Sequence, residues 1–443
     1  MPAPVQPPRG MRDFPPAEKR RRDAVLATIR EVYARHGFDE IETPVMEDAS
    51  RLHAGLGGDN EKLSFAVLRR GLDAAELARA AEADDPLLLS DLGLRFDLTV
   101  PLARFYASHR GSLPTVFRAF QAAPVWRAER PQKGRYRQFV QCDIDILGEA
   151  GPLAETELLA ATSEALAALG LDACTIRIGD RRLLRALLTA CGFPEEQHLG
   201  ALVSLDKLDK IGAEGVHAEL AERDGAAAGR LAGTLRAWEP LLRAGIAPER
   251  EAMLAALPEA VREEPEALAA VESIAGVAAA VRAAGARIPI VYDPTLVRGM
   301  GYYTGTIFEL AHPGSGSSVG GGGRYDGMIG RFLGQDVPAC GVSIGFERIV
   351  DLVEAPAAAG ERTGLALLLD RRAPAAEAVA VKAAVLERGE WPRVRLERKP
   401  KNLRNLLAGL REQGFSHVAH VREEHLVDPA SLRIEPLAGP DGA

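Results

Sequence analysis

Residues 125–139 read VWRAERPQKGRYRQF and join two strand-like segments, the second of which is FVQCDIDILG (139–148). Because a polar, glycine-containing loop separates the two segments, the sequence predicts a β-hairpin at this point. The loop is unusually basic for a chain whose formal net charge is −8. Against one acid, Glu129, it carries Arg127, Arg130, Lys133, Arg135 and Arg137.

The basic loop has two interpretations. Most short basic runs are solvated surface loops. Here, however, arginines outnumber lysines, and planar guanidinium groups suit bidentate recognition of phosphate. The loop also leads into Phe139 on a predicted strand, where alternate side chains share one face. An aromatic ring with two or three arginines on such a face indicates a nucleotide site, in which the ring stacks on the base and the arginines hold phosphates.

The length of the chain predicts several domains, because 443 residues exceed one ordinary core. Strand and helix signals are mixed over 1–194, an Ala-, Leu-, Glu- and Arg-rich stretch at 195–285 predicts a helical insertion, and strand signals resume over 286–354. After a small-residue linker, residues 363–443 alternate strand and helix. That alternation predicts a compact α/β domain.

Composition excludes several classes of protein. No apolar run reaches the length of a membrane span. The four cysteines are scattered without a CxxC pair, which argues against a disulfide framework or structural zinc and predicts a cytoplasmic location. His417, His420 and His425 lack acidic ligands at zinc spacing, so no metal site built from protein side chains is predicted. The acidic average leaves nucleic acid open as a partner, since local patches govern that binding.

Three aspartates, Asp97, Asp143 and Asp145, lie in strand-like segments dominated by apolar residues. Either they face solvent on alternating strands, or they recognise a cationic or hydrogen-bonding ligand such as an amino group. A second unusual stretch, GGGGRYDGM (320–328), does not match the GxxxxGK[ST] phosphate loop. It predicts closely packed strands that need backbone without side chains.

Taken in order over about residues 9–350, these segments resemble one family, the histidyl-tRNA synthetases of class II. The matching segments are PRGMRDFPP, GFDEIETPVMED (motif 1), VWRAERPQKGRYRQFVQCDIDILG (motif 2), LVRGMGYYTGTIFE (the histidine-specific segment), and GGGRYDGMIG with GVSIGFERI (motif 3). The resemblance implies an α+β fold: an antiparallel sheet flanked by helices, a helical insertion, and a short C-terminal α/β domain of the anticodon-binding type. Motif 1 implies a two-fold symmetric homodimer.

The resemblance also implies the reaction. The carboxylate of L-histidine attacks the α-phosphate of ATP, giving histidyl-adenylate and pyrophosphate, and histidine then passes to the 3′ end of tRNA-His. No protein nucleophile is needed, so catalysis depends on positioning and on neutralising phosphate charge, with Mg²⁺ accompanying ATP. The implied ATP-binding residues are Arg127 (α-phosphate), Glu129 (adenine amino group), Phe139 (adenine stacking), and Arg135 with Arg348 (γ-phosphate). Arg298 would bridge the histidine carboxylate and the α-phosphate, which makes Arg127 and Arg298 the implied catalytic residues.

The remaining implied residues bind histidine or tRNA. They are Asp97, Thr99 and Gln141 for the α-amino group, Asp145 and Tyr303 for the imidazole with Tyr302 beside them, and Arg130 with Gln132 for the acceptor end of the tRNA. A site that pairs both imidazole nitrogens leaves buried polar groups unmet when a wrong side chain enters, so no editing domain is required. Gly301 stands where the family usually has Asp, so an orienting hydrogen bond near Tyr303 is lost or replaced.

Two other functions share the resemblance. One is the regulatory subunit of ATP phosphoribosyltransferase, a paralogue that binds histidine without activating it. The other is a synthetase-like enzyme that activates histidine for an acceptor other than tRNA. The chain keeps all four arginines of the implied site and has a segment beyond residue 363, and both features favour the tRNA ligase.

Overall fold

The computed structural model describes residues 5–52, 63–131, 134–298, 303–354 and 364–437. The chain divides into two compact units. The larger comprises Met1–Asp13 and Val25–Glu354, and the smaller comprises Phe14–Ala24 and Ala355–Ala443. The first long helix, α1 (Pro16–Arg35), contributes residues to both.

An eight-stranded sheet forms the centre of the larger unit, in the order β1-β5-β6-β11-β10-β9-β7-β8. The strands are β1 (Asp39–Glu40), β5 (Phe117–Trp126), β6 (Gln138–Leu147), β7 (Thr175–Asp180), β8 (Ile290–Tyr292), β9 (Thr306–Ala311), β10 (Gly320–Arg324) and β11 (Ala339–Gly345). The six inner strands, from β5 to β7, pair antiparallel, and the two edge strands pair parallel. The α+β class is confirmed, and so is the predicted hairpin, since β5 and β6 pair directly across the basic loop.

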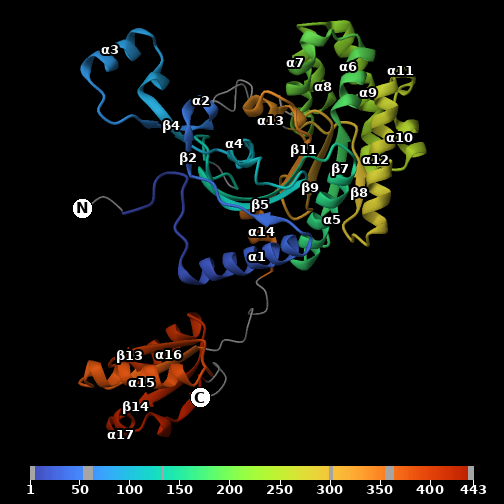
Figure 1. The fold of residues 1–443 in the computed structure, drawn as a ribbon. Coiled ribbons are helices and arrows are strands. Elements are labelled where there is room, and N and C mark those ends of the chain that lie inside the picture. Colours follow the sequence, from blue (N-terminus) through green and yellow to red (C-terminus); the bar gives the residue numbers. More distant parts are fainter. Residues whose placement is uncertain (1–4, 53–62, 132–133, 299–302, 355–363, 438–443) are drawn as a thin grey trace. The chain divides into compact units, whose positions relative to one another are not determined.

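Side chains of β6 point alternately to the two faces of this sheet, and the two sets differ in polarity. Cys142, Ile144 and Ile146 pack on what we call the back face, with α1, α5 (Leu153–Ala168) and α14 (Phe346–Leu352). The opposite front face carries the polar residues of the strand, and α4 (Thr99–His109) and α13 (Asp326–Leu333) cover one end of it around Leu147. Figure 1 shows α1 and α14 on one side of the sheet and α4 and α13 on the other.

A smaller sheet and a long helical segment complete this unit. The sheet has the order β2-β4-β3. Its strands are β2 (Met46–Asp48), β3 (Phe65–Leu68) and β4 (Ser90–Leu94), and they are accompanied by α2 (Ala49–Leu52), α3 (Ala74–Glu82) and η2 (Pro86–Leu89). Residues 39–48 alternate as one strand would, with a break at Pro44, but the structure has two short strands here in two different sheets. The break at Pro44 therefore marks a change of sheet, because proline cannot donate to a strand ladder.

Helices follow one another through residues 195–285, where the structure has no strand. They are α7 (Glu195–Leu205), α8 (Leu208–Ala221), α9 (Gly225–Ala244), α10 (Arg250–Ala256), α11 (Glu259–Arg262) and α12 (Pro265–Ala283), and α6 (Arg181–Cys191) precedes them. Their apolar faces join the back-face core through residues such as Leu231, Trp238 and Ile274.

The smaller unit contains a four-stranded sheet in the order β13-β12-β14-β15. Its elements are β12 (Gly364–Leu369), α15 (Ala375–Glu387), β13 (Arg393–Arg398), α16 (Leu403–Glu412), β14 (Phe415–Val421), α17 (Glu423–Val427), η3 (Pro429–Ser431) and β15 (Ile434–Pro436). Strand β12 is buried throughout and lies between two parallel neighbours, which explains its continuous apolar run.

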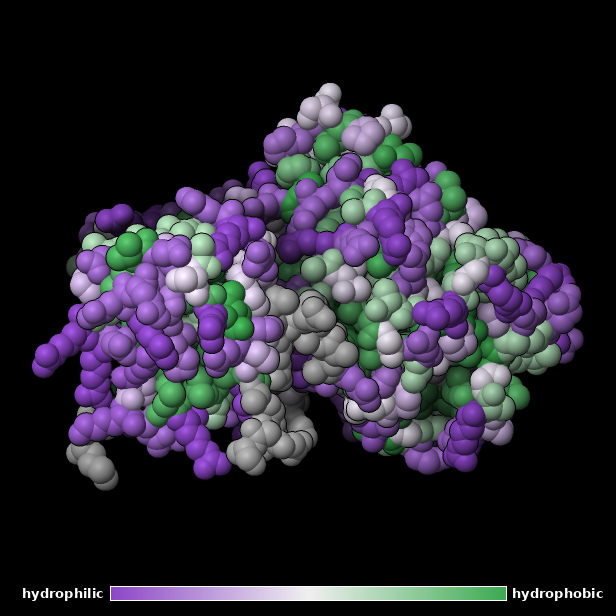
Figure 2. Space-filling view, turned by 90° about the horizontal axis from the view of Figure 1, so that it is seen from below, coloured by the Kyte–Doolittle hydropathy of each residue, from purple (hydrophilic) through white to green (hydrophobic). Residues whose placement is uncertain are grey.

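Among the described residues, no helix has the length and apolar character needed to cross a membrane. Polar side chains predominate on the face drawn in Figure 2, where apolar ones form small separate areas.

Candidate active site

A row of polar side chains crosses the front face of the central sheet. Residues paired directly across neighbouring strands project to the same side. The strand register therefore aligns Gln121, Asp143, Ser343, Gly321, Glu309 and Arg177, from β5 across to β7. Two residues further along β6, Asp145 is aligned with Gly341 and Gly323 on the same face. The front face is thus a polar floor interrupted by glycines.

The glycines make room for functional side chains. A Cβ on Gly321 would lie 2.6 Å from the guanidinium carbon of Arg298, and one on Gly341 would lie 1.9 Å from Oδ1 of Asp145. On the back side, a Cβ on Gly322 would meet the backbone oxygen of Gly341. The prediction that the glycine run serves close packing rather than a phosphate loop is confirmed.

The three aspartates lie at one end of this floor. Asp143 and Asp145 are each only 4 % exposed, so they do not face solvent. Burial raises the pKa of Asp145 to about 7 and that of Asp97 to about 6. Burial and the neighbouring Asp145 also raise the pKa of Asp143 well above its usual range. Such a cluster favours a cationic ligand, because a positive charge would relieve both the desolvation and the mutual repulsion.

Hydrogen bonds from distant parts of the chain fix these carboxylates. The hydroxyl of Tyr325 donates to Oδ1 of Asp145 over 2.5 Å, and the hydroxyl of Ser343 donates to Asp143. Gln141 donates its amide Nε2 to Oγ of Ser343 over 3.1 Å, while its own Oε1 is buried and has no hydrogen-bond partner among the described residues. Tyr325 and Ser343 were not among the predicted site residues, and their role depends on register rather than on local pattern.

The hairpin brings Arg127 and Phe139 together. Arg127 follows β5 directly, and its Nε donates to the backbone oxygen of Phe96 over 3.0 Å. This places its guanidinium carbon 5.0 Å from the centroid of the Phe139 ring. Further out on the loop, Arg135 lies 3.4 Å from the carboxylate of Glu129, and Arg130 is exposed.

Four arginines from three separate segments lie close enough for their charges to interact. The pKa of Arg348 is lowered by burial, and then by the nearby charges of Arg135, Arg298 and Arg127. Glu309 opposes this lowering. Arg348 itself donates to the backbone oxygen of Ser318. Because like charges are held close together here, the arrangement favours a polyanionic ligand.

Glu309 organises the arginine end of the floor. One carboxylate oxygen accepts from Arg298 over 2.7 Å, and the other accepts from Arg177 over the same distance. Arg177 is held in turn by Asp293. This network fixes Arg298 beside Gly321 and uses both oxygens of the acid.

The other predicted residues are placed as follows. Thr99 begins α4, two residues after Asp97, whose Oδ1 accepts from the backbone N–H of Val100. Tyr303 is half-buried and packs against both core clusters of the larger unit. Gln132, Gly301 and Tyr302 lie outside the described residues.

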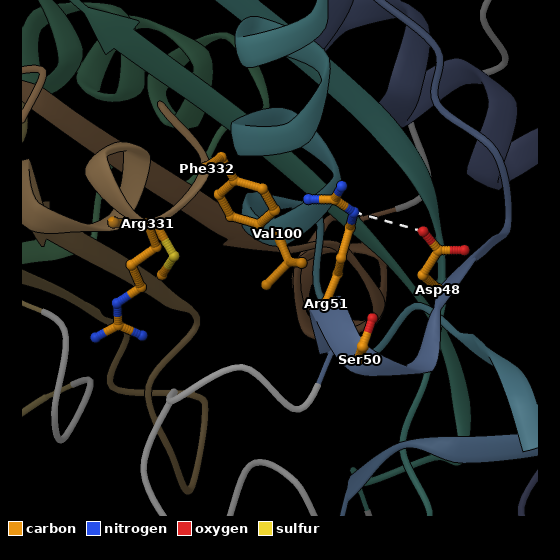
Figure 3. Close-up of a pocket in the computed structure, with 7 residues that line it drawn as sticks. Asp48, Ser50, Arg51, Val100, Arg331 and Phe332 are labelled. Atoms are coloured by element: carbon orange, nitrogen blue, oxygen red, sulfur yellow. Dashed lines mark ion pairs between the residues drawn. The ribbon is translucent and has the colours of Figure 1, made fainter. Parts of the chain in front are cut away.

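A hollow of about 280 Å³ lies elsewhere in the same unit. It is lined by Asp48, Ser50, Arg51, Val100, Met328, Arg331 and Phe332. In it the Arg51 guanidinium extends toward the Phe332 ring and pairs with Asp48 (Figure 3). None of the predicted site residues lines this hollow, so the polar floor is the better candidate for the chemistry. Within the described residues, no group of His, Cys, Asp and Glu could hold a metal ion.

Comparisons of the sequence with known proteins all identify the same family. A family model described as histidyl-tRNA synthetase matches residues 10–349. The histidine–tRNA ligase of Leifsonia xyli subsp. xyli is 57% identical over 99% of both chains. The probable histidine–tRNA ligase of Tropheryma whipplei is 40% identical, over 99% of this chain and 97% of its own.

Solved structures agree on the fold. The histidyl-tRNA synthetase of Nostoc sp. PCC 7120 superposes with a TM-score of 0.72 at 23% identity, covering 98% of this chain and 97% of that one. An ATP phosphoribosyltransferase regulatory subunit/histidyl-tRNA synthetase from Bacillus halodurans has the same TM-score at 21% identity, covering 92% and 97%. At these identities the structures show a shared fold and do not separate an enzyme from a regulator.

Proposed function

The chain belongs to the histidyl-tRNA synthetase family and is a class II histidine–tRNA ligase, and we propose that the polar floor of its central sheet is where histidine and ATP react. The observation that carries this proposal is the pairing of two opposite charge environments on one face. Asp143 and Asp145 are buried with the half-buried Asp97 beside them, and four arginines form a second group, of which Arg127 is close enough to lower the pKa of Asp97 and Asp143. Histidine carries an ammonium group and a carboxylate, and ATP carries the phosphates, so the two substrates fit these ends.

The arginine end binds ATP in this proposal. Phe139 stacks on adenine and Glu129 accepts from its amino group. Arg127 holds the α-phosphate, and Arg135 with Arg348 holds the γ-phosphate. Arg298, which is held beside Gly321 by Glu309, bridges the histidine carboxylate and the α-phosphate in this proposal. Fixed guanidinium groups stabilise the charge that develops as the carboxylate attacks phosphorus, and they do so without reorganisation during the step.

The aspartate end binds histidine. Asp97, Thr99 and Gln141 receive the ammonium group, and Oε1 of Gln141, to which no residue in the described part of the chain donates, supplies an acceptor that a bound donor would satisfy. Asp145 and Tyr303 hydrogen-bond the imidazole, with Tyr302 beside them. Tyr325 keeps Asp145 in one orientation, so the imidazole meets a fixed acceptor. A side chain without two ring nitrogens would leave these groups unpaired.

Magnesium fits this site as part of the nucleotide. Both oxygens of Glu309 are engaged by arginines, so the acid nearest Arg298 is not available to form a metal cage. Mg²⁺ is commonly held by substrate phosphates with few protein ligands. The phosphate oxygens of ATP would hold the ion here, and it would supply further neutralisation of phosphate charge.

The second step and the assembly complete the proposal. Arg130 and Gln132, on the hairpin loop, contact the acceptor end of tRNA-His, and residues 363–443 form an anticodon-binding-like domain. The catalytic core is divided into 1–194 and 286–354 by the insertion at 195–285. The protein acts in the cytoplasm as a two-fold homodimer that uses motif 1. Its four cysteines are all buried and form no disulfide, which suits a reducing compartment.

Two assays test the proposed function. Purified protein should catalyse histidine-dependent ATP–pyrophosphate exchange, and it should charge a tRNA-His transcript with histidine. Intact protein without exchange would favour the histidine-binding regulator. Exchange without charging would favour activation of histidine for another acceptor. The full-length relative at 57% identity favours neither alternative.

A further inference from the structure

The N-terminal segment packs against the base of the hairpin loop, which we define as residues 127–137. The backbone oxygen of Gly10 accepts from the N–H of Arg137 over 2.8 Å. Gly10 has φ of +84°, and a Cβ there would lie 2.7 Å from Pro131 and 3.0 Å from Arg137. Only glycine fits this position without strain. The N-terminal segment therefore packs closely against the hairpin loop.

The contacted residue, Arg137, makes two hydrogen bonds across the hairpin loop. Its backbone oxygen accepts from the N–H of Arg127 over 2.9 Å. Its Nε donates to the backbone oxygen of Glu129 over 3.0 Å. The N-terminal segment thus reaches two residues of the proposed ATP site through one intermediate.

Arg12 makes the second connection. Its guanidinium pairs with the carboxylate of Glu347, and its carbon lies 3.5 Å from the centroid of the Tyr136 ring. The Glu347 side chain is 8 % exposed, so the partner of this cation is a nearly buried acid. Tyr136 precedes Arg137 in the loop, and Glu347 precedes Arg348 in α14. Arg12 therefore joins the loop to the helix that carries one of the proposed phosphate-binding arginines.

Glu347 connects the same contact to the strand that bears Phe139. Strand β11 ends at Gly345, opposite Gln141. The next N–H of β6, that of Val140, donates to Oε1 of Glu347 over 3.1 Å. The carboxylate thus takes the place of a further backbone partner and fixes α14 against β6. One acid binds Arg12 through one oxygen and the Phe139 strand through the other.

We propose that Arg12 is a positioning residue for the nucleotide: with Glu347, it sets the hairpin loop and Phe139 at a fixed distance from Arg348. This inference rests on the proposed function of those three elements. The contacts of Arg12 with Glu347 and Tyr136 both lie among the elements proposed to hold ATP, so its loss should impair the use of ATP and spare the binding of histidine. Misplacement of binding groups by about 1 Å can cost about 100-fold in rate.

The test compares Arg12→Met, Arg12→Lys and Glu347→Gln with the wild-type protein. Met keeps an unbranched apolar stem and removes the charge, Lys keeps the charge without the planar group, and Gln keeps an acceptor for Val140. Histidine-dependent ATP–pyrophosphate exchange is measured with each substrate varied, and melting temperatures are recorded. We expect KM for ATP to rise about tenfold or more in Arg12→Met and Glu347→Gln, with KM for histidine within twofold of wild type and partial recovery in Arg12→Lys.

The double variant Arg12→Met/Glu347→Gln supplies the coupling test. If Arg12 and Glu347 act through their contact with each other, the KM for ATP of the double variant should be no higher than that of the more impaired single variant. The matched control is Arg30→Met, which breaks an exposed pair between Arg30 of α1 and Glu40 of β1 and should leave both KM values unchanged.

The outcomes separate this inference from the proposed function. Absence of exchange in the wild-type protein would contradict the proposed function itself. An active wild type with an unchanged KM for ATP in Arg12→Met overturns the inference, as does an equal rise in both KM values, which marks general loss of structure. If Arg12→Met does not fold, the same criteria applied to Glu347→Gln and Arg12→Lys decide.

Discussion

Substituting Gly341 by alanine tests the histidine end of the floor by steric means. The backbone at Gly341 does not have a positive φ, so alanine is compatible with its local conformation. The added methyl, however, would lie 1.9 Å from Oδ1 of Asp145, whereas carbon atoms of this kind keep at least 3.0 Å from a neighbour. The carboxylate must therefore retreat by about 1 Å and leave the hydroxyl of Tyr325. A displacement of that size in a binding group corresponds to about 100-fold in rate, or about 2.7 kcal/mol.

The assay is histidine-dependent ATP–pyrophosphate exchange at saturating ATP with histidine varied, followed by the converse. Gly341→Ala should lower kcat/KM for histidine about 100-fold and leave KM for ATP nearly unchanged. Crowding should also lower stability by about 1–3 kcal/mol, so a melting curve must show that the protein is folded at the assay temperature. Gly276→Ala in α12 is the control, since among the described residues no atom beyond its chain neighbours and its own helix backbone lies within 4 Å of the added methyl. A folded Gly341→Ala protein with a wild-type response to histidine would refute the placement of Asp145 at the substrate.

Three further predictions concern charge. Arg298→Ala should reduce exchange by about two orders of magnitude or more and leave the dimer intact in size-exclusion chromatography, because it removes a fixed cation from the reacting phosphate; near-normal activity would remove Arg298 from the mechanism. The pKa of Asp145 is raised to about 7 in the folded protein. Between about pH 4 and 7 the folded protein therefore keeps a proton on this carboxyl that the unfolded chain has released, so the free energy of unfolding falls as pH rises through that range. Above about pH 7 the loss of stability is complete. Asp145→Asn should therefore gain about 2 kcal/mol relative to wild type between pH 5 and pH 8, measured from melting curves, and a constant difference would contradict the assignment. Arg130→Ala should keep exchange within twofold of wild type and lower tRNA charging about tenfold, as expected for loss of one exposed contact to nucleic acid; equal losses in both assays would place Arg130 at ATP instead.

Local sequence patterns were sufficient to predict the hairpin that carries Arg127 and Arg135. The hairpin follows from two strand-like segments around a polar loop, and the structure pairs β5 with β6 as expected. The helical insertion and the alternating C-terminal segment follow from periodicity, which adjacent residues determine. The resemblance adds an order of motifs, and both the family match over 10–349 and the relative at 57% identity confirm it.

The register between strands of the central sheet could not be predicted from the sequence. Asp143 and Ser343 are 200 residues apart, and Asp145 and Tyr325 are 180 apart, yet both pairs are hydrogen-bonded. The sequence could not choose between solvent-facing and ligand-facing aspartates, because alternation along β6 does not say which face of the sheet is covered. Helices α4 and α13, from separate parts of the chain, make that choice by burying one end of the front face.

The sequence by itself determined which chemical groups are available: the arginines of the hairpin loop and motif 3, the acids of β6, and glycines where backbone must be bare. Only the tertiary structure decided which of these groups meet. It aligned the polar row through strand register, buried Asp143 and Asp145, and brought Arg12 to Glu347 across 335 residues. The physical reason is that periodicity depends on neighbouring residues, whereas burial and electrostatic coupling depend on segments that come together only when the sheet forms.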